Sequence, residues 1–208
     1  CYPNSFTDEV LKVMASDPRF CRYLDMPFQH ISDPVLKKMN RKITRKEIEA
    51  TMSRVRSQLP DVAWRTTFIV GFPTETDQDF EELVDFVLEG HFQHLGIFLY
   101  SDEDNIRSSK FGDPIPLSLK EDRKNRLMEI QQKISREHHQ KMVGSLQQVL
   151  VGGFSSETDL LLEGRNQYQG PEVDGVVYIN EGNATSAGFH QVEITEAHEY
   201  DLVGKILN

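Results

Sequence analysis

The sequence predicts an α/β domain followed by a small all-β domain, and three observations support this fold class. Short apolar runs alternate with amphipathic helices over the first two thirds of the 208 residues, which is typical of parallel βα units. Several helices are preceded by capping residues. After Gly144, short β-branched segments separated by Gly, Asn and Ser indicate a small antiparallel, OB-like β-barrel. We therefore expect an α/β domain over residues 1–140 and a β-barrel over residues 141–208.

Three apolar runs are the expected strands of the α/β domain, at residues 23–28, 63–70 and 95–100. The expected helices begin at capping residues, with Asp33 as N-cap and Pro34 as first helical residue in one case. Three further starts have capping-box spacing: Thr44 with Glu47, Thr76 with Asp79, and Ser118 with Glu121. A long helix is expected from residue 119 to about residue 142. The barrel segments are expected at residues 148–151, 173–179 and 192–194.

The charge of the chain is acidic and unevenly distributed. The net charge is −10, which argues against a general nucleic-acid binder, because such proteins need a basic surface to neutralise phosphates. Residues 1–140 hold 20 Lys and Arg against 23 Asp and Glu, whereas residues 141–208 hold 3 against 10, a balance of −7. The expected β-barrel is therefore the acidic part of the protein.

The remaining composition excludes other classes of protein. No apolar run reaches the roughly 18 residues of a membrane span, and no signal sequence is visible, so we expect a cytoplasmic protein. The two cysteines, Cys1 and Cys21, are interpreted as reduced thiols, and no metal site is expected from this chain's own residues. Because the sequence begins with Cys rather than Met, we expect it to be a fragment of a longer protein.

Arg65 and Thr67 are unusual inside a strand of otherwise buried character. Strand geometry places them on one face with Ala63 and Ile69, opposite the face that helices should cover. A buried guanidinium needs a partner. A polar ligand in an open barrel would supply one, and so would an ion pair with Asp25 on the preceding strand; both interpretations remain open.

The ends of the expected strands carry the candidate binding residues. Gly71 and Pro73 form a turn at a carboxyl end, the edge at which α/β sheets and barrels bind ligands. Gln29 and His30 follow the preceding strand, and the Gln29 amide can both donate and accept hydrogen bonds. An ordinary βα turn and a structural histidine are the alternatives.

Three segments in one order and spacing carry a resemblance to a known family: "YLDMPFQHISDPVLKKMNRK", "RTTFIVGFPTET" and "IFLYSDED". They resemble the last three strand ends of the radical-SAM barrel in the methylthiotransferases, most closely the RimO type. The tail, with "EGRNQYQGPEVDGVVYI" and "EYDLVG", is similar to the TRAM domain of that type. The resemblance covers essentially the whole chain and implies the C-terminal half of a partial (β/α) barrel followed by TRAM.

The resemblance implies a function, cofactors and site residues. RimO-type enzymes add a methylthio group to the β-carbon of an aspartate in a small-subunit ribosomal protein, using S-adenosyl-L-methionine and two 4Fe-4S clusters. Gln29, Arg65 and Thr67 would then line the lumen near S-adenosylmethionine. The turn of Gly71, Phe72 and Pro73, with Tyr100, would border its adenine. No catalytic residue is assigned.

Departures from the family pattern limit what is carried over. The cluster motif Cys-x-x-x-Cys-x-x-Cys is absent, so this fragment alone should bind neither cluster and be inactive. Thr74 stands where the family usually has Gly, which puts a left-handed backbone there in doubt. The "SDEDNIRSS" stretch differs from the family's continuation after the last strand, so no contact is carried over from it.

Two alternatives to this function remain: a tRNA methylthiotransferase of the same superfamily and a non-catalytic module that docks to the ribosome. The acidic tail favours a basic ribosomal protein as partner over tRNA, although an acidic surface can also serve solubility alone. A basic cluster could contact ribosomal RNA, with a solvated helix face as its alternative. The cluster comprises Lys37, Lys38, Arg41, Lys42, Arg45, Lys46, Arg54 and Arg56.

Overall fold

The computed structural model describes residues 6–103, 109–182, 184 and 187–207. The chain divides into two compact units. The first holds residues up to 131 apart from residues 21–23, and the second holds residues 21–23 together with those from 132 onward. None of the described helices is long and apolar enough to cross a bilayer.

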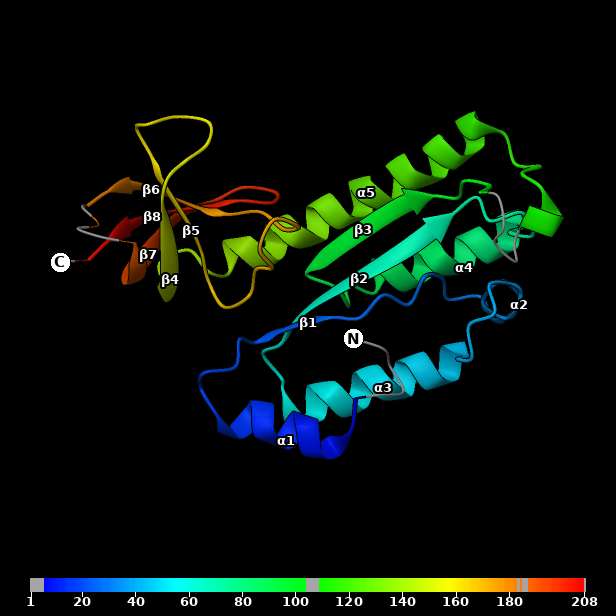
Figure 1. Ribbon diagram of the computed structural model, residues 1–208, viewed down its shortest axis with the longest axis horizontal. Coiled ribbons are helices and arrows are strands. Elements are labelled where there is room, and N and C mark those ends of the chain that lie inside the picture. Colours follow the sequence, from blue (N-terminus) through cyan, green and yellow to red (C-terminus); the bar gives the residue numbers. More distant parts are fainter. Residues whose placement is uncertain (1–5, 104–108, 183, 185–186, 208) are drawn as a thin grey trace. The chain divides into compact units, whose positions relative to one another are not determined.

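The first unit is a three-stranded sheet with helices between its strands (Figure 1). The strands are β1 (Tyr23–Asp25), β2 (Ala63–Val70) and β3 (His94–Leu99), in the order β1-β2-β3. The β2 and β3 strands are parallel, with Arg65 opposite His94 and Val70 opposite Leu99. The helices are α1 (Asp8–Ser16), α2 (Asp33–Lys38), α3 (Arg45–Gln58), α4 (Asp77–Leu88) and the first part of α5 (Leu117–Gln140), with a short 3-10 helix, η2 (Ser109–Phe111).

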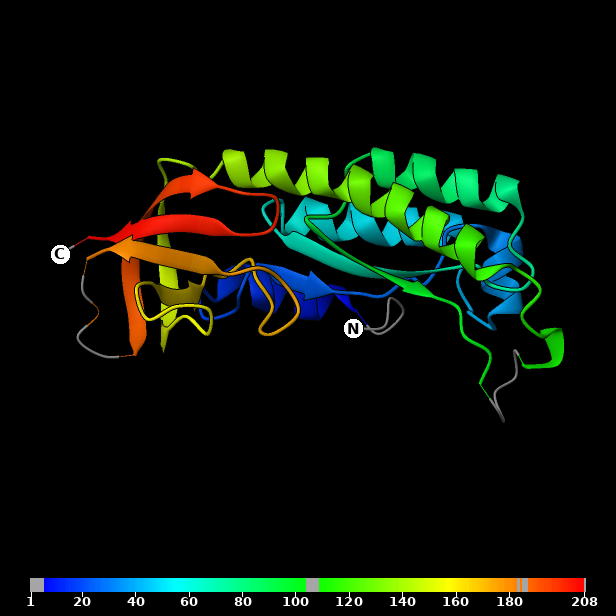
Figure 2. The same cartoon turned by 90° about the horizontal axis from the view of Figure 1, so that it is seen from above.

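The β2 strand alternates between buried and half-buried residues, as expected. Trp64, Thr66 and Phe68 are fully buried, whereas Arg65 and Thr67 on the opposite face are half-buried. In Figure 2, α4 and α5 lie on one side of this sheet. The core behind β2 is aromatic, and the rings of Phe68 and Phe92 pack edge to face with centres 5.8 Å apart. The parallel α/β architecture predicted from the sequence is confirmed.

The helix starts are partly as predicted. Thr44 and Thr76 form complete capping boxes at α3 and α4. The α2 helix begins at Asp33 with Ser32 as N-cap, so the assignment of Asp33 as N-cap is wrong by one residue. A proline is tolerated throughout the first helical turn, so Pro34 could not fix that boundary.

Two other helices differ from the prediction. The α5 helix begins at Leu117, which places Ser118 inside it rather than at its cap. The α1 helix was missed, although Thr7 caps it and acidic Asp8 and Glu9 fill its first turn, which suits the positive end of the helix dipole.

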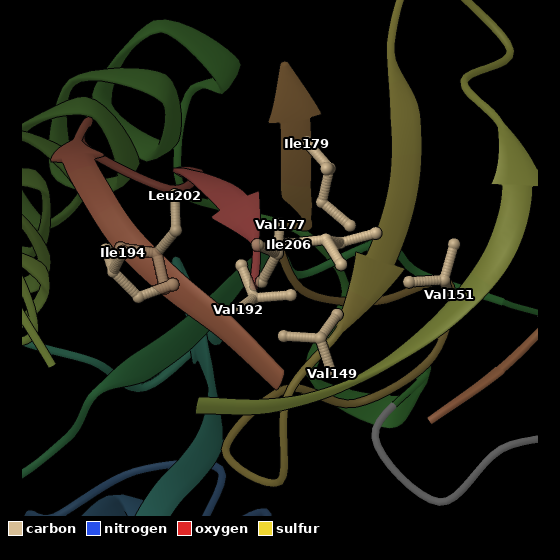
Figure 3. Close-up of a cluster of buried hydrophobic side chains, with 8 residues drawn as sticks. All are labelled: Val149, Val151, Val177, Ile179, Val192, Ile194, Leu202 and Ile206. Carbon is tan, nitrogen blue, oxygen red and sulfur yellow. The ribbon is translucent and has the colours of Figure 1, made fainter. Parts of the chain in front are cut away.

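The second unit holds a closed five-stranded barrel in the order β4-β5-β6-β8-β7. Its strands are β4 (Leu146–Phe154), β5 (Leu162–Arg165), β6 (Val177–Glu181), β7 (Gly188–Ala197) and β8 (Leu202–Ile206). The barrel is confirmed, but it is not wholly antiparallel, because β8 lies between β7 and β6 and pairs with β6 in parallel. Figure 3 shows its core, formed by Val149, Val151, Val177, Ile179, Val192, Ile194, Leu202 and Ile206.

Candidate active site

The carboxyl ends of the strands bring two predicted site positions, Gln29 and Tyr100, to one edge of the sheet. The backbone N–H of Gln29 donates to the Thr67 carbonyl at 2.8 Å, and the backbone carbonyl of Gln29 accepts from the Ile69 N–H at 2.8 Å, which continues the pairing beyond β1. The Tyr100 amide donates to the Val70 carbonyl at 2.9 Å. Gln29 has a left-handed backbone with φ 74°, which is costly for a non-glycine residue and is often found at functional sites.

A pocket of about 420 Å³ lies at this edge. Its apolar wall comes from Ile69, Phe72, Leu99 and Tyr100, and the rings of Phe72 and Tyr100 pack edge to face with centres 5.3 Å apart. The other lining residues are mostly polar: Gln29, Lys38, Met39, Asn40, Arg41, Ser101 and Glu103. The pocket therefore offers one face for an aromatic or apolar group and another for hydrogen bonds and charge.

Of the seven predicted site residues, Gln29, Phe72 and Tyr100 line this pocket, whereas four others do not. Gly71 and Pro73 belong to the turn that holds Phe72. Arg65 and Thr67 lie further back in β2, where both side chains are close to Gly96 of β3. A Cβ built on Gly96 would lie 3.4 Å from Arg65 Nη2 and 3.5 Å from Thr67 Oγ1.

Arg65 has the protein partner that the sequence offered as an alternative to a ligand. Its Nη1 lies 3.2 Å from Asp25 Oδ2, and its side chain is 14% exposed. The pair neutralises the guanidinium charge and holds it at the sheet face. Thr74 does not have the left-handed backbone of a family glycine, since the described non-glycine residues with positive φ are Gln29, Asn40 and Glu172.

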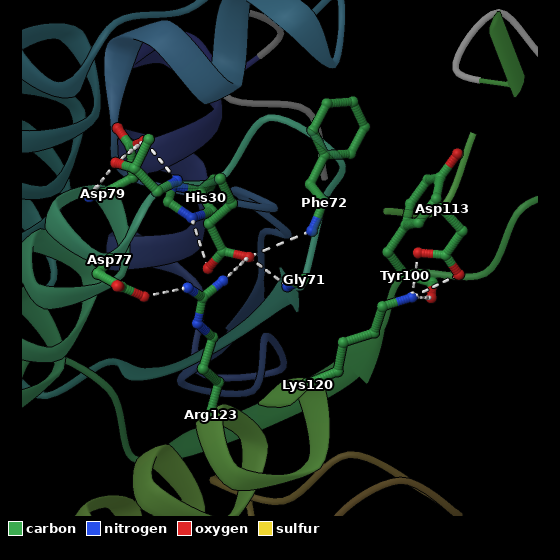
Figure 4. Close-up of polar contacts among 11 residues, drawn as sticks. His30, Gly71, Phe72, Asp77, Asp79, Tyr100, Asp113, Lys120 and Arg123 are labelled. Atoms are coloured by element: carbon green, nitrogen blue, oxygen red, sulfur yellow. Dashed lines mark hydrogen bonds and ion pairs between the residues drawn. The ribbon is translucent and has the colours of Figure 1, made fainter. Parts of the chain in front are cut away.

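A buried network behind the Gly71 turn was missed by the sequence interpretation (Figure 4). The Glu75 carboxylate, fully buried, accepts hydrogen bonds from the backbone amides of Gly71 and Phe72. Arg123 of α5 forms an ion pair with this carboxylate, with Nη1 3.2 Å from Oε2, and His30 Nε2 lies 3.6 Å from Oε1. The charged carboxylate thus has backbone donors and a counter-charge, which burial requires.

Lys120, three residues before Arg123 on α5, is also buried. Its ammonium group donates to the Tyr100 carbonyl at 2.8 Å and to Asp113 Oδ2 at 2.6 Å. Its alkyl stem packs against Gly71, so that a Cβ at Gly71 would overlap the Lys120 Cγ. The helical spacing that places Lys120 and Arg123 on one face could have indicated a shared role, but charged residues at such positions are usually solvated.

The pocket offers an unpaired hydroxyl, whereas the described part of the chain offers no ligand set for a metal cluster. The Tyr100 hydroxyl is buried without a hydrogen-bond partner among the described residues, so it is free to bind a ligand. Within those same residues, no group of three His, Cys, Asp or Glu could hold a metal ion. The chain has only two cysteines.

Comparison with known proteins gives a family for both units. The radical SAM superfamily model matches residues 1–87, and the TRAM domain model matches residues 143–207. Ribosomal protein uS12 methylthiotransferase RimO of Desulfotalea psychrophila is 46% identical over 100% of this chain, and that of Bdellovibrio bacteriovorus is 48% identical over 99%. The chain is a homologue of the RimO methylthiotransferases. It covers 47% and 45% of these two RimO proteins, about half their length.

The homology to RimO confirms the resemblance found in the sequence, over the C-terminal radical-SAM region and the TRAM domain. Among solved structures, coproporphyrinogen III oxidase (HemN) from Escherichia coli, a radical SAM enzyme, is similar in fold with a TM-score of 0.53. The match covers 64% of this chain and 31% of that chain at 19% identity, so it supports the fold alone.

The "SDEDNIRSS" loop lies largely outside the described residues.

Proposed function

We propose that the protein containing this chain is a radical-SAM methylthiotransferase that adds a methylthio group to the β-carbon of an aspartate in ribosomal protein uS12. The observation that carries this proposal is the 46% identity to a uS12 methylthiotransferase across the whole of this chain, through both the strand-end pocket and the barrel. The pocket supplies a site of suitable size and polarity for the cofactor that the radical SAM family implies.

The role of this chain's residues in that function is to bind and orient S-adenosylmethionine. When bound, this cofactor and two 4Fe-4S clusters supply the radical chemistry that an unactivated carbon requires. Phe72 and Tyr100 provide the apolar wall for the adenine, the Tyr100 hydroxyl and the side-chain amide of Gln29 provide hydrogen bonds, and Gly71 and Pro73 shape the turn. The cluster ligands would be residues other than the two cysteines of this chain.

Arg65 and Thr67 extend the proposed site along the sheet face. The pairing with Asp25 reduces the charge that Arg65 offers to a ligand, but a carboxylate accepts more than one donor and a guanidinium carries five. Arg65 can therefore keep its contact with Asp25 and donate to a bound polar group. Thr67 lies on the same face of β2, also close to Gly96, and adds a hydroxyl to this surface.

The acidic barrel is the proposed docking surface for uS12, in the cytoplasm. Residues 141–208 carry a balance of −7, which suits a basic protein rather than tRNA. The alternative is contact with ribosomal RNA through the basic cluster. It is weakened because three arginines of that cluster already contact other groups of this chain. Arg45 pairs with Glu49, Arg54 pairs with Asp8, and Arg56 donates to the His91 carbonyl.

The test is a competition between substrates. The full-length protein, reconstituted with iron and sulfide under anaerobic conditions, is incubated with S-adenosylmethionine, reductant, purified uS12 and bulk tRNA. We expect methylthio groups on uS12 and none on tRNA, detected by mass spectrometry of both. Modification of tRNA instead would favour the tRNA methylthiotransferase alternative, and modification of neither would favour a ribosome-docking module.

A further inference from the structure

We propose that Lys120 and Arg123 of α5 are positioning residues that hold the two strand ends bordering the pocket. The inference rests on the proposed function, because it concerns the pocket assigned there to S-adenosylmethionine. Neither residue lines that pocket. Both act through the backbone at the ends of β2 and β3, which carry Phe72 and Tyr100.

Arg123 acts on the end of β2 through Glu75. The Glu75 carboxylate receives the amides of Gly71 and Phe72, and the Glu75 amide in turn donates to the Phe72 carbonyl at 2.8 Å. This loop of hydrogen bonds fixes the backbone of the turn. A fully buried carboxylate is stable only with a counter-charge, and Arg123, whose side chain is 4% exposed, provides it. Without Arg123, the turn would lose the group that keeps Glu75 in place.

Lys120 acts on both strand ends at once. Its ammonium group holds the carbonyl of Tyr100 at the end of β3, while its stem packs against Gly71 at the end of β2. The ammonium charge is balanced by Asp113, and the Lys120 side chain is 3% exposed. In Figure 4, Lys120 and Arg123 extend from the same helix, Lys120 toward Tyr100 and Asp113 and Arg123 toward Asp77. The spacing between Phe72 and Tyr100, which sets the width of the apolar wall, therefore depends on α5.

Loss of Lys120 should therefore weaken cofactor binding although Lys120 does not line the pocket. When the Lys120 charge is lost, the Tyr100 carbonyl loses its donor and the two strand ends can separate. Because displacements below 1 Å weaken a preorganised site, we expect Lys120→Met to reduce affinity about tenfold. Lys120→Arg keeps the charge and a donor, so it should recover most of that loss.

The experiment measures binding of S-adenosylhomocysteine, a stable analogue, to the full-length protein by calorimetry. Lys120→Met, Lys120→Arg and the exposed control Lys133→Met, on the same helix, are compared with the unaltered protein. We expect the dissociation constant to rise about tenfold in Lys120→Met and in neither of the other two variants. The KM for S-adenosylmethionine should rise by the same factor, whereas the rate of 5′-deoxyadenosine formation at saturating S-adenosylmethionine should stay within about twofold of the unaltered protein. Hydrogen exchange at the amides of residues 71, 72 and 100 should become faster in that variant.

The outcomes separate the inference from the proposed function. Equal affinity in Lys120→Met and the unaltered protein would overturn the inference and leave the proposed function standing. No binding by the unaltered protein would contradict both. If Lys120→Met does not fold, Asp113→Asn takes its place, since the Asp113 side chain is 35% exposed and its change removes only the charge partner of Lys120. A rise in the dissociation constant smaller than tenfold is then expected, because Lys120 keeps its bond to the Tyr100 carbonyl but loses its charge partner, and an unchanged constant would overturn the inference.

Discussion

Two features of the structure require glycine at position 71. Its φ of 75° lies in the left-handed region, and the space that a side chain would fill holds the Lys120 stem. Gly90 is a matched position, because its φ is 71° and nothing lies within 4 Å of a Cβ there. The two glycines therefore separate the backbone cost of a side chain from its packing cost.

We predict that Gly71→Ala lowers the free energy of unfolding more than Gly90→Ala does. The left-handed backbone should cost about 1 kcal/mol in both variants, and overpacking against Lys120 should add about 2 kcal/mol in Gly71→Ala alone. Urea titration of the chain followed by circular dichroism measures both. Equal losses in the two variants would show that Lys120 yields without cost.

The residues also show what a sequence can predict of a site. Period-two alternation predicted the face of Arg65, because strand geometry is local, but it left Asp25 and a polar ligand as alternative partners of the guanidinium. The Glu75–Arg123 pair spans 48 positions of the sequence, and no local pattern marks it. The left-handed backbone of Gln29 could not be predicted from the sequence either, since it accompanies backbone hydrogen bonds from both its N–H and its carbonyl to β2.

At the scale of elements, the α4 capping box differs from that of α3 in being tied to a second element. Asp79 accepts from the Thr76 amide at 2.9 Å and the Thr76 hydroxyl at 2.6 Å, and it also accepts from the buried Ser32 hydroxyl beside α2. Burial works to raise the pKa of Asp79, but the hydrogen bonds from Ser32 and Thr76 outweigh it and hold the pKa below 3.8. In α3, Glu47 caps the helix at an exposed position.

This difference predicts a pH dependence of stability. Since the folded pKa of Asp79 is depressed, its contribution is complete above the unfolded value of 3.8 and is lost as pH falls through the lower folded value. Asp79→Asn should therefore lower stability by about 1 kcal/mol at pH 7 and flatten the decline of stability below pH 3.8. The matched change Glu47→Gln should have a smaller effect. Acid titrations of both variants measure this, and an unchanged profile in Asp79→Asn would refute it.

Element boundaries were predicted best where side chains set them. The capping boxes fixed α3 and α4 correctly, and the βα alternation gave the parallel sheet. The order of the barrel strands was not predictable, because the parallel pairing of β8 with β6 joins segments whose local pattern is the same as in antiparallel pairs.

At the scale of the whole molecule, the proposed division of labour is a cofactor pocket in residues 1–140 and an acidic docking barrel in residues 141–208. We predict that the full chain binds purified uS12 more tightly than bulk tRNA, and that the uS12 affinity falls as salt rises from 50 to 300 mM (both chosen around the physiological ~150 mM) because screening weakens attraction between opposite charges. Fluorescence anisotropy with labelled uS12 and labelled tRNA measures both. Tighter binding of tRNA would contradict the docking proposal.

The measurement that tests the proposed function most directly is the mass of uS12 from ribosomes of cells with and without the full-length gene. We predict that deletion of the gene removes one methylthio group from the target aspartate, that the intact gene restores it, and that tRNA methylthiolation is unchanged. An unaltered uS12 mass, with loss of methylthiolation in tRNA, would contradict the assignment of uS12 as substrate.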